Sequence, residues 1–80
     1  MLFPARLSLN GHYLTAREAE ILWLCLQGLT SPAIAEKLSV SPKTVERHKE
    51  NIRTRFGLYG YHALMQFAQE YREELEKWVE

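Results

Sequence analysis

Residues 41–52, with the sequence SPKTVERHKENI, carry side chains that can make directional hydrogen bonds to a ligand. At about 100° per residue along a helix, Val45 and Ile52 fall on one side of this stretch, and polar side chains fill the opposite side. Arginine can form a forked pair with guanine, asparagine can pair with adenine, and glutamate can accept from the cytosine amino group. The four candidates for contact with base edges are Glu46, Arg47, Glu50 and Asn51.

Basic and hydroxyl side chains flank these candidates and can supply affinity for a phosphate backbone without reading its sequence. The residues expected in this role are Ser31, Lys43, Thr44, Arg53 and Arg55. Both glutamates also lie at helical spacing from basic neighbours, where an intrahelical ion pair contributes roughly a few tenths of a kcal/mol. For Glu50, base contact and ion pairing are equal alternatives, whereas pairing or orientation of neighbours is favoured for Glu46.

The charges are segregated along the chain, although the 80 residues have no net charge. Residues 37–55 hold six basic residues and two glutamates, a net charge of +4, whereas residues 70–80 have a net charge of −3. Because fields fall off within a Debye length of about 8–10 Å, the local charge decides whether an anionic partner is attracted. A basic segment of this kind indicates DNA binding or, as the commoner alternative, a solvated helix face.

We expect neither an enzymatic activity nor a cofactor. His12, His48 and His62 show no close spacing with one another or with Cys25, so they form no expected set of metal ligands. The sequence has no glycine-rich phosphate loop and no arrangement of serine, histidine and acid typical of nucleophilic catalysis. A single cysteine excludes an internal disulfide and fits the reducing cytoplasm, where we expect a nucleoid-associated protein.

Three successive helices are predicted from helix-start and helix-stop signals. A capping box of Thr15 and Glu18 opens the first, and Gly28 ends it because glycine readily takes the left-handed conformation that follows a helix. Ser31 and Ser41 each precede a proline and are expected to cap the second and third helices. A tight turn separates these two helices, the pattern of a helix-turn-helix unit, although a generic αα-corner has the same spacing.

A last helix is predicted from about Tyr61 to Val79, with an apolar seam along its length. The second half of this seam extends beyond what a small core needs, and an exposed aromatic stripe usually contacts a partner. Packing of the seam against the N-terminal segment LFPARLSL is the alternative. The residues expected at a dimer interface are Leu64, Tyr71, Leu75 and Trp78.

Residues 1–13 are predicted to form an N-terminal arm, in which Leu7, Leu9 and the pair Asn10-Gly11 indicate an extended segment or a tight turn. The length of the chain fits one small domain. No apolar run approaches the ~20 residues that a membrane-spanning helix needs, and the N-terminus lacks the features of a signal peptide. We therefore expect no membrane association.

Residues 14–58, LTAREAEILWLCLQGLTSPAIAEKLSVSPKTVERHKENIRTRFGL, closely resemble the helix-turn-helix domain of LuxR/FixJ/GerE-type bacterial transcriptional regulators. The matching residues lie in register without gaps and include Leu14-Thr15-x-Arg17-Glu18, Gly28-Leu29, Ile34-Ala35, Lys43-Thr44-Val45-Glu46, His48, Asn51-Ile52 and Gly57. The resemblance implies an all-α, four-helix domain, which we place at residues 14–80, and we expect the last helix of this chain to be extended beyond the family pattern. It also implies that the third helix, about residues 42–56, reads the DNA major groove and that the fourth pairs two protomers as a homodimer on an inverted repeat.

Position by position, the resemblance implies phosphate contacts for Lys43 and Thr44. The positions that usually face base edges hold Glu46, Arg47 and Glu50, with Asn51 as a polar neighbour. A glutamate at position 50 is less usual in the family, so it bears on which operator is read. The chain also departs from the family at residues 59–62, YGYH, where a polar cap normally opens the fourth helix, and in its acidic C-terminal extension EYREELEKWVE.

The sequence therefore predicts a sequence-specific DNA-binding transcriptional regulator, either a stand-alone effector domain or the excised C-terminal part of a larger regulator. Its expected partners are double-stranded DNA and a second copy of the chain, with a contact to RNA polymerase left open. Two alternatives keep the same fold. One is a protein-interaction adaptor whose acidic tail docks a partner, and the other is a promoter-binding domain like that of sigma factors, whose opening LTxRE is similar.

Overall fold

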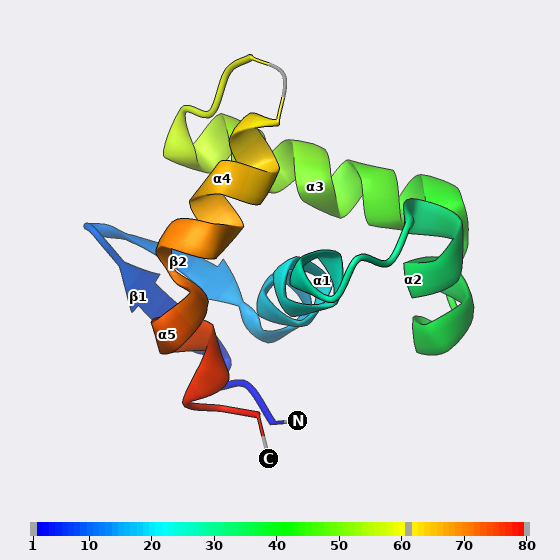
Figure 1. The fold of residues 1–80 in the computed structure, drawn as a ribbon, viewed down its shortest axis with the longest axis horizontal. Coiled ribbons are helices and arrows are strands. Elements are labelled where there is room, and N and C mark those ends of the chain that lie inside the picture. Colours follow the sequence, from blue (N-terminus) through cyan, green and yellow to red (C-terminus); the bar gives the residue numbers. More distant parts are fainter. Residues whose placement is uncertain (1, 61, 80) are drawn as a thin grey trace.

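The computed structural model describes residues 2–60 and 62–79, which form a two-stranded hairpin and five helices (Figure 1). The elements along the chain are β1 (Arg6–Leu9), β2 (His12–Thr15), α1 (Ala16–Leu26), α2 (Ser31–Leu38), α3 (Pro42–Phe56), α4 (Ala63–Glu70) and α5 (Arg72–Glu76). The domain is mostly helical, as the sequence predicts. The expected all-α, four-helix description is corrected by the small sheet and by the fifth helix.

The N-terminal residues form an antiparallel hairpin. Leu9 pairs with His12, so the connecting turn consists of Asn10-Gly11. Both turn residues have positive φ, 47° and 88°, which matches the two-residue turn that follows the twist of a hairpin and favours Asn-Gly. Leu7 and Leu9 are buried while the residues between and before them are exposed. Both features indicated by the sequence are observed, because Leu7 and Leu9 lie in an extended strand and Asn10-Gly11 forms the tight turn.

The first helix begins and ends where the sequence predicts. The backbone N–H of Glu18 donates to the Thr15 hydroxyl at 3.1 Å, and the backbone N–H of Thr15 donates to the Glu18 carboxylate at 3.0 Å. These two bonds form the predicted capping box at the start of α1. Gly28 follows the last residues of the helix with a φ of 87°, a conformation that costs glycine little.

The next two helices begin differently from each other. Ser41 caps α3 as predicted, and its hydroxyl accepts from the backbone N–H of Thr44 at 3.2 Å. The prediction that Ser31 caps α2 is wrong by one residue, because Thr30 accepts from the backbone N–H of Ala33 at 3.3 Å instead. Ser31 is therefore the first residue of α2, and its hydroxyl can bond a partner outside the helix end.

The C-terminal segment forms two helices where one extended helix is predicted. The predicted start at Tyr61 lies outside the described residues, and α4 begins at Ala63. The helical path breaks at Tyr71, which has φ −104° and ψ 20°, and α5 follows directly. The segment after α5 lies beside the N-terminal segment, where the Leu2 N–H donates to the Trp78 carbonyl at 3.2 Å (Figure 1).

Helix α1 lies at the centre of the molecule, between two apolar clusters (Figure 1). One cluster gathers α1, the hairpin, α4 and α5 around Leu22 and Ile52. The other gathers α1, α2 and the first half of α3 around Ile34 and Val45. Val45 and Ile52 have no exposed surface, and full burial of such a side chain stabilises a fold by about 1.5–3 kcal/mol. These two residues hold one face of α3 inward, which leaves its opposite face to solvent.

Candidate nucleic-acid interface

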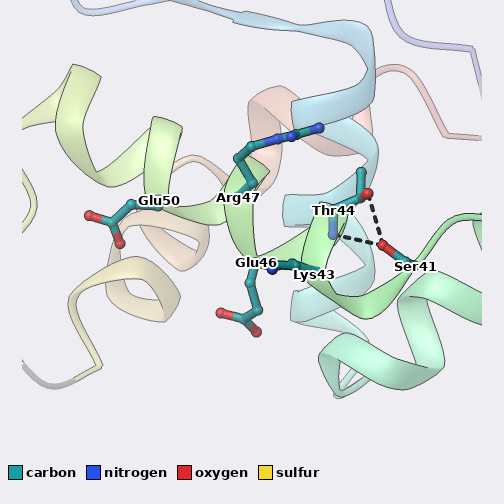
Figure 2. A pocket seen from close by; sticks show the side chains of 6 residues that line it. All are labelled: Ser41, Lys43, Thr44, Glu46, Arg47 and Glu50. Carbon is teal, nitrogen blue, oxygen red and sulfur yellow. Dashed lines mark hydrogen bonds between the residues drawn. The ribbon is translucent and has the colours of Figure 1, made fainter.

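The exposed face of α3 carries most of the residues that the sequence singles out (Figure 2). A hollow of about 510 Å³, open to solvent, is lined by Ser41, Lys43, Thr44, Glu46, Arg47 and Glu50. The first turn of α3 is ordered by Ser41, whose hydroxyl lies 3.0 Å from that of Thr44. Acidic and basic side chains thus share the exposed face of a helix whose first turn is capped by Ser41.

Three of the candidate contact residues keep their donors available. The side chains of Lys43, Arg47 and Asn51 are exposed and form no hydrogen bond or ion pair with another residue of the described ranges 2–60 and 62–79. Guanidinium and amide groups are the donors that pair with guanine and adenine in the major groove. The face therefore combines free hydrogen-bonding groups with a cationic side chain near the start of the helix.

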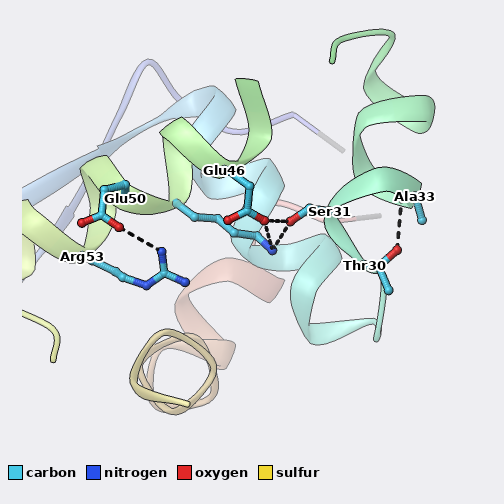
Figure 3. A network of polar contacts seen from close by, with 7 residues as sticks. Thr30, Ser31, Ala33, Glu46, Glu50 and Arg53 are labelled. Carbon is cyan, nitrogen blue, oxygen red and sulfur yellow. Dashed lines mark hydrogen bonds and ion pairs between the residues drawn. The ribbon is translucent and has the colours of Figure 1, made fainter. Parts of the chain in front are cut away.

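Glu46 is tied to the first residue of α2 (Figure 3). The Ser31 hydroxyl donates to Oε2 of Glu46, and the Lys49 ammonium donates to the Ser31 hydroxyl at 2.7 Å. Nζ of Lys49 also lies 3.9 Å from Oε2 of Glu46. The pairing favoured for Glu46 by the sequence is thus observed. Ser31, expected at a phosphate, is buried within this cluster. Lys49 is one of the basic neighbours at helical spacing with which the sequence predicts an ion pair for Glu46.

Glu50 pairs along the same helix with Arg53 (Figure 3), whose Nη1 lies 3.3 Å from Oε1 of Glu50. The two side chains are 69% and 36% exposed. An exposed pair of this kind contributes about 0–1 kcal/mol. The pair is weak enough for either side chain to turn toward DNA, so pairing and base contact are compatible for Glu50.

Arg55 has internal partners instead of a free guanidinium. It donates to both carboxylate oxygens of Glu18, with Nη2 3.0 Å from Oε2, and to the Tyr13 carbonyl at 3.0 Å. Glu18 is only 2% exposed. The fork holds the end of α3 to the start of α1, and a phosphate contact by Arg55 stays a prediction. No sequence signal points to this pairing, because the capping box already accounts for Glu18.

The ionisation of Glu18 follows from these contacts. Burial alone would raise the pKa of its carboxyl, but hydrogen bonds from Arg55 and from the Thr15 backbone N–H, with the positive charges of Arg55 and His48, outweigh burial and lower the pKa below its ordinary value. The hydrogen bond to Glu18 raises the pKa of Arg55 in return. The pair is therefore fully ionised at neutral pH.

The residues expected at a dimer interface are divided between core and surface. Leu64 and Leu75 are buried, the second completely, and the ring of the half-buried Tyr71 lies 4.9 Å from that of Phe67. Trp78 retains 40% of its exposure. Leu75 belongs to the cluster that contains the leucines of β1, so the alternative packing of the seam against the N-terminal segment is observed.

We also searched the described part of the chain for a metal site, a reactive thiol and a membrane-spanning helix. Within it, no group of three or more His, Cys, Asp or Glu residues is placed to hold a metal ion. Burial raises the pKa of the Cys25 thiol, which keeps it protonated and poorly nucleophilic. None of the described helices has the length and apolar character needed to cross a membrane.

Helices α2 and α3, joined by the three residues 39–41, define a helix-turn-helix domain with the polar face of its longer helix exposed. The sequence profile of the family described as "Bacterial regulatory proteins, luxR family" matches residues 12–68. The chain therefore belongs to the LuxR family of bacterial regulatory proteins. The resemblance seen in residues 14–58 is confirmed.

Among curated proteins, the chain is similar to the oxygen regulatory protein NreC of Staphylococcus aureus, from strains JH9, JH1 and Mu3. The identity is 49% over 55 residues, which are 69% of this chain and 25% of NreC. The chain thus spans about a quarter of the length of the curated relatives it matches. No solved structure gives a significant match.

Proposed function

We propose that this chain is a sequence-specific DNA-binding domain of a transcriptional regulator and that α3 reads the major groove. The observation that carries the proposal is the polar face of α3, which is exposed opposite the buried Val45 and Ile52. Arg47 and Asn51 on this face have unengaged donors within the described chain, and such donors distinguish base pairs in the major groove. Glu46 and Glu50 add acceptors beside them.

Contacts to the phosphate backbone come from the flanks of the same helix. Lys43 and Thr44 lie at its start, where backbone N–H groups also favour an anion, and Arg53 lies nine residues beyond Thr44. The net charge of +4 over residues 37–55 supports attraction of DNA to this segment. Because binding of this kind releases counterions, affinity should fall steeply with salt.

The proposed assembly is a homodimer on an inverted repeat, formed through the C-terminal helices. Trp78 and the half-buried Tyr71 are the predicted interface residues with surface to offer a second copy. Leu64 and Leu75 would support that surface from inside the protomer. In a two-fold dimer, half-sites lie about 34–36 Å apart, or one helical turn of DNA.

Fluorescence anisotropy with operator-selected and random duplexes at two salt concentrations tests the proposal. We expect the selected duplex to bind at least ~10³-fold more tightly than the random one, with a steep loss of affinity at the higher salt. Selected sequences should be inverted repeats. Absence of binding to both duplexes would overturn the proposal and favour the protein-interaction adaptor.

A further inference from the structure

We infer that Ser31 and Lys49 are positioning residues for Glu46, and that Glu46, held in this way, selects a C·G base pair in each operator half-site. The inference rests on the proposed DNA-binding function and deepens it, because it assigns a base preference to one side chain. It also gives Ser31 a role other than the phosphate contact expected from the sequence.

The contacts of Glu46 use one side of its carboxylate. Ser31 donates to Oε2, and Nζ of Lys49 lies 3.9 Å from the same oxygen. Oε1 has no partner within the described residues, and the Glu46 side chain is 58% exposed. Glu46 also lines the hollow on the face of α3 with Arg47 and Glu50 (Figure 2). One oxygen is therefore anchored and the other is presented on the proposed DNA-reading face.

The position of Lys49 reduces the electrostatic obstacle to a carboxylate near DNA. A lone carboxylate is repelled by phosphates, but the ammonium of Lys49 lies close enough to offset much of its charge. The Lys49 side chain is only 13% exposed, and its ammonium is directed at Ser31. Lys49 thus acts within the protein, as a counter-charge for Glu46, and leaves phosphate contacts to Lys43 and Arg53.

An acceptor held at this place favours cytosine over the other bases. Guanine offers only acceptors in the major groove, and thymine offers an acceptor and a methyl group. Adenine has an amino group, but its N7 acceptor lies beside it and repels a carboxylate. Cytosine presents its N4 amino group with no acceptor on its own major-groove edge, where adenine has N7. Holding the carboxylate in advance lowers the conformational entropy that binding would otherwise cost.

Because Ser31 does not cap α2, its contact with Glu46 can be removed without removing the helix cap. Thr30, and not Ser31, caps this helix by accepting from the Ala33 N–H. Replacing Ser31 with alanine therefore removes the bond to Glu46 while the helix cap remains. Thermal unfolding of each variant would confirm that the domain is still folded before its base preference is measured.

The experiment is selection of duplexes from a pool randomised over one half-site, followed by sequencing, with the wild type and with variants. Wild type should prefer cytosine at one position by about tenfold, the size of one good base contact. Glu46→Gln should move that preference toward adenine, which glutamine recognises. Ser31→Ala should weaken the cytosine preference by about two- to tenfold, the effect of freeing one long side chain.

Two variants serve as matched controls. Glu36→Gln removes the same charge from an exposed position on α2 and should leave the selected sequence unchanged. Ser31→Thr keeps a hydroxyl and should retain more of the cytosine preference than Ser31→Ala. A selected sequence that neither Glu46→Gln nor Ser31→Ala alters would overturn the inference while the proposed function stands. An effect of Glu46→Gln alone would overturn the positioning role. Failure of the wild type to select any sequence would overturn both proposals.

Discussion

The guanidinium of Arg55, at the end of α3, forks onto the buried carboxylate of Glu18, which lies 37 residues earlier in the first turn of α1. The same carboxylate closes the capping box with Thr15, and the same guanidinium donates to the Tyr13 carbonyl of β2. One ion pair thus joins the hairpin, α1 and α3. It holds the C-terminal end of the proposed recognition helix against the rest of the domain.

Replacing Arg55 with alanine should lower the free energy of unfolding by about 3 kcal/mol, because it leaves the carboxylate of Glu18 buried without a counter-charge. Urea denaturation measures this change. Arg53→Ala is the matched control, since it removes the exposed partner of Glu50 and should cost less than about 1 kcal/mol. Equal losses of unfolding free energy in the two variants would show that the Arg55–Glu18 pair stabilises the domain no more than the exposed Arg53–Glu50 pair does.

Acid should weaken the wild-type fold more than it weakens Glu18→Gln. Contacts in the folded state lower the pKa of Glu18 below 4.5, so its stabilising effect is complete above that pH and is lost as the pH falls through the folded pKa. Glutamine at this position does not titrate. The difference in unfolding free energy between the two proteins should therefore narrow as the pH falls below about 4.5. Denaturation curves collected across this range would contradict the assignment if the difference stayed constant.

Substitutions at two apolar residues near the C-terminus should affect stability and self-association differently. Leu75→Ala should destabilise the domain by about 2–5 kcal/mol, because its side chain is completely buried. Trp78→Ser should change the unfolding free energy by less than about 1 kcal/mol but weaken the proposed dimer. Denaturation and analytical ultracentrifugation measure the two effects. An unaltered sedimentation profile for Trp78→Ser would exclude this residue from the interface.

Loss of the Arg47 side chain should affect both affinity and sequence preference. Arg47→Ala should cost about 1–3 kcal/mol of binding free energy on a selected operator and relax the preference at one base pair. Anisotropy titrations against operators substituted at each position provide the measurement. Arg72→Ala removes the same charge from an exposed position on α5 and is the control. If both variants lost affinity equally and uniformly across sequences, Arg47 would be a phosphate contact only.

The helices were predictable because their start and stop signals act over three or four residues. The Thr15–Glu18 capping box and the Ser41 cap are examples, since each bond joins neighbours in the chain. The one misplaced cap arose where Thr30 and Ser31 both offered a hydroxyl. Thr30 caps the helix, whereas the Ser31 hydroxyl bonds Glu46 on another helix, 15 residues away. A contact at that distance is not visible in the local sequence.

The C-terminal seam was predicted as apolar, but its partner was not. A helical period indicates which residues share a face and leaves open whether a core or a second protomer covers them. In the structure the helix breaks at Tyr71, and Leu75 packs in the cluster that includes the hairpin. Only Trp78 among the four expected interface residues remains substantially exposed.

Sequence alone was enough to identify the family, the helix-turn-helix unit and the polar face of α3, because motifs in register and helical periodicity are properties of neighbouring residues. Packing of the helices was needed to show which polar groups are bound internally and which are exposed to a ligand. Arg55 and Ser31, both expected at phosphates, are bonded to Glu18 and Glu46, which packing brings beside them. Such contacts cannot be inferred from the sequence, because a long polar side chain has several partners within its reach and only the packing of helices distant in the chain selects among them.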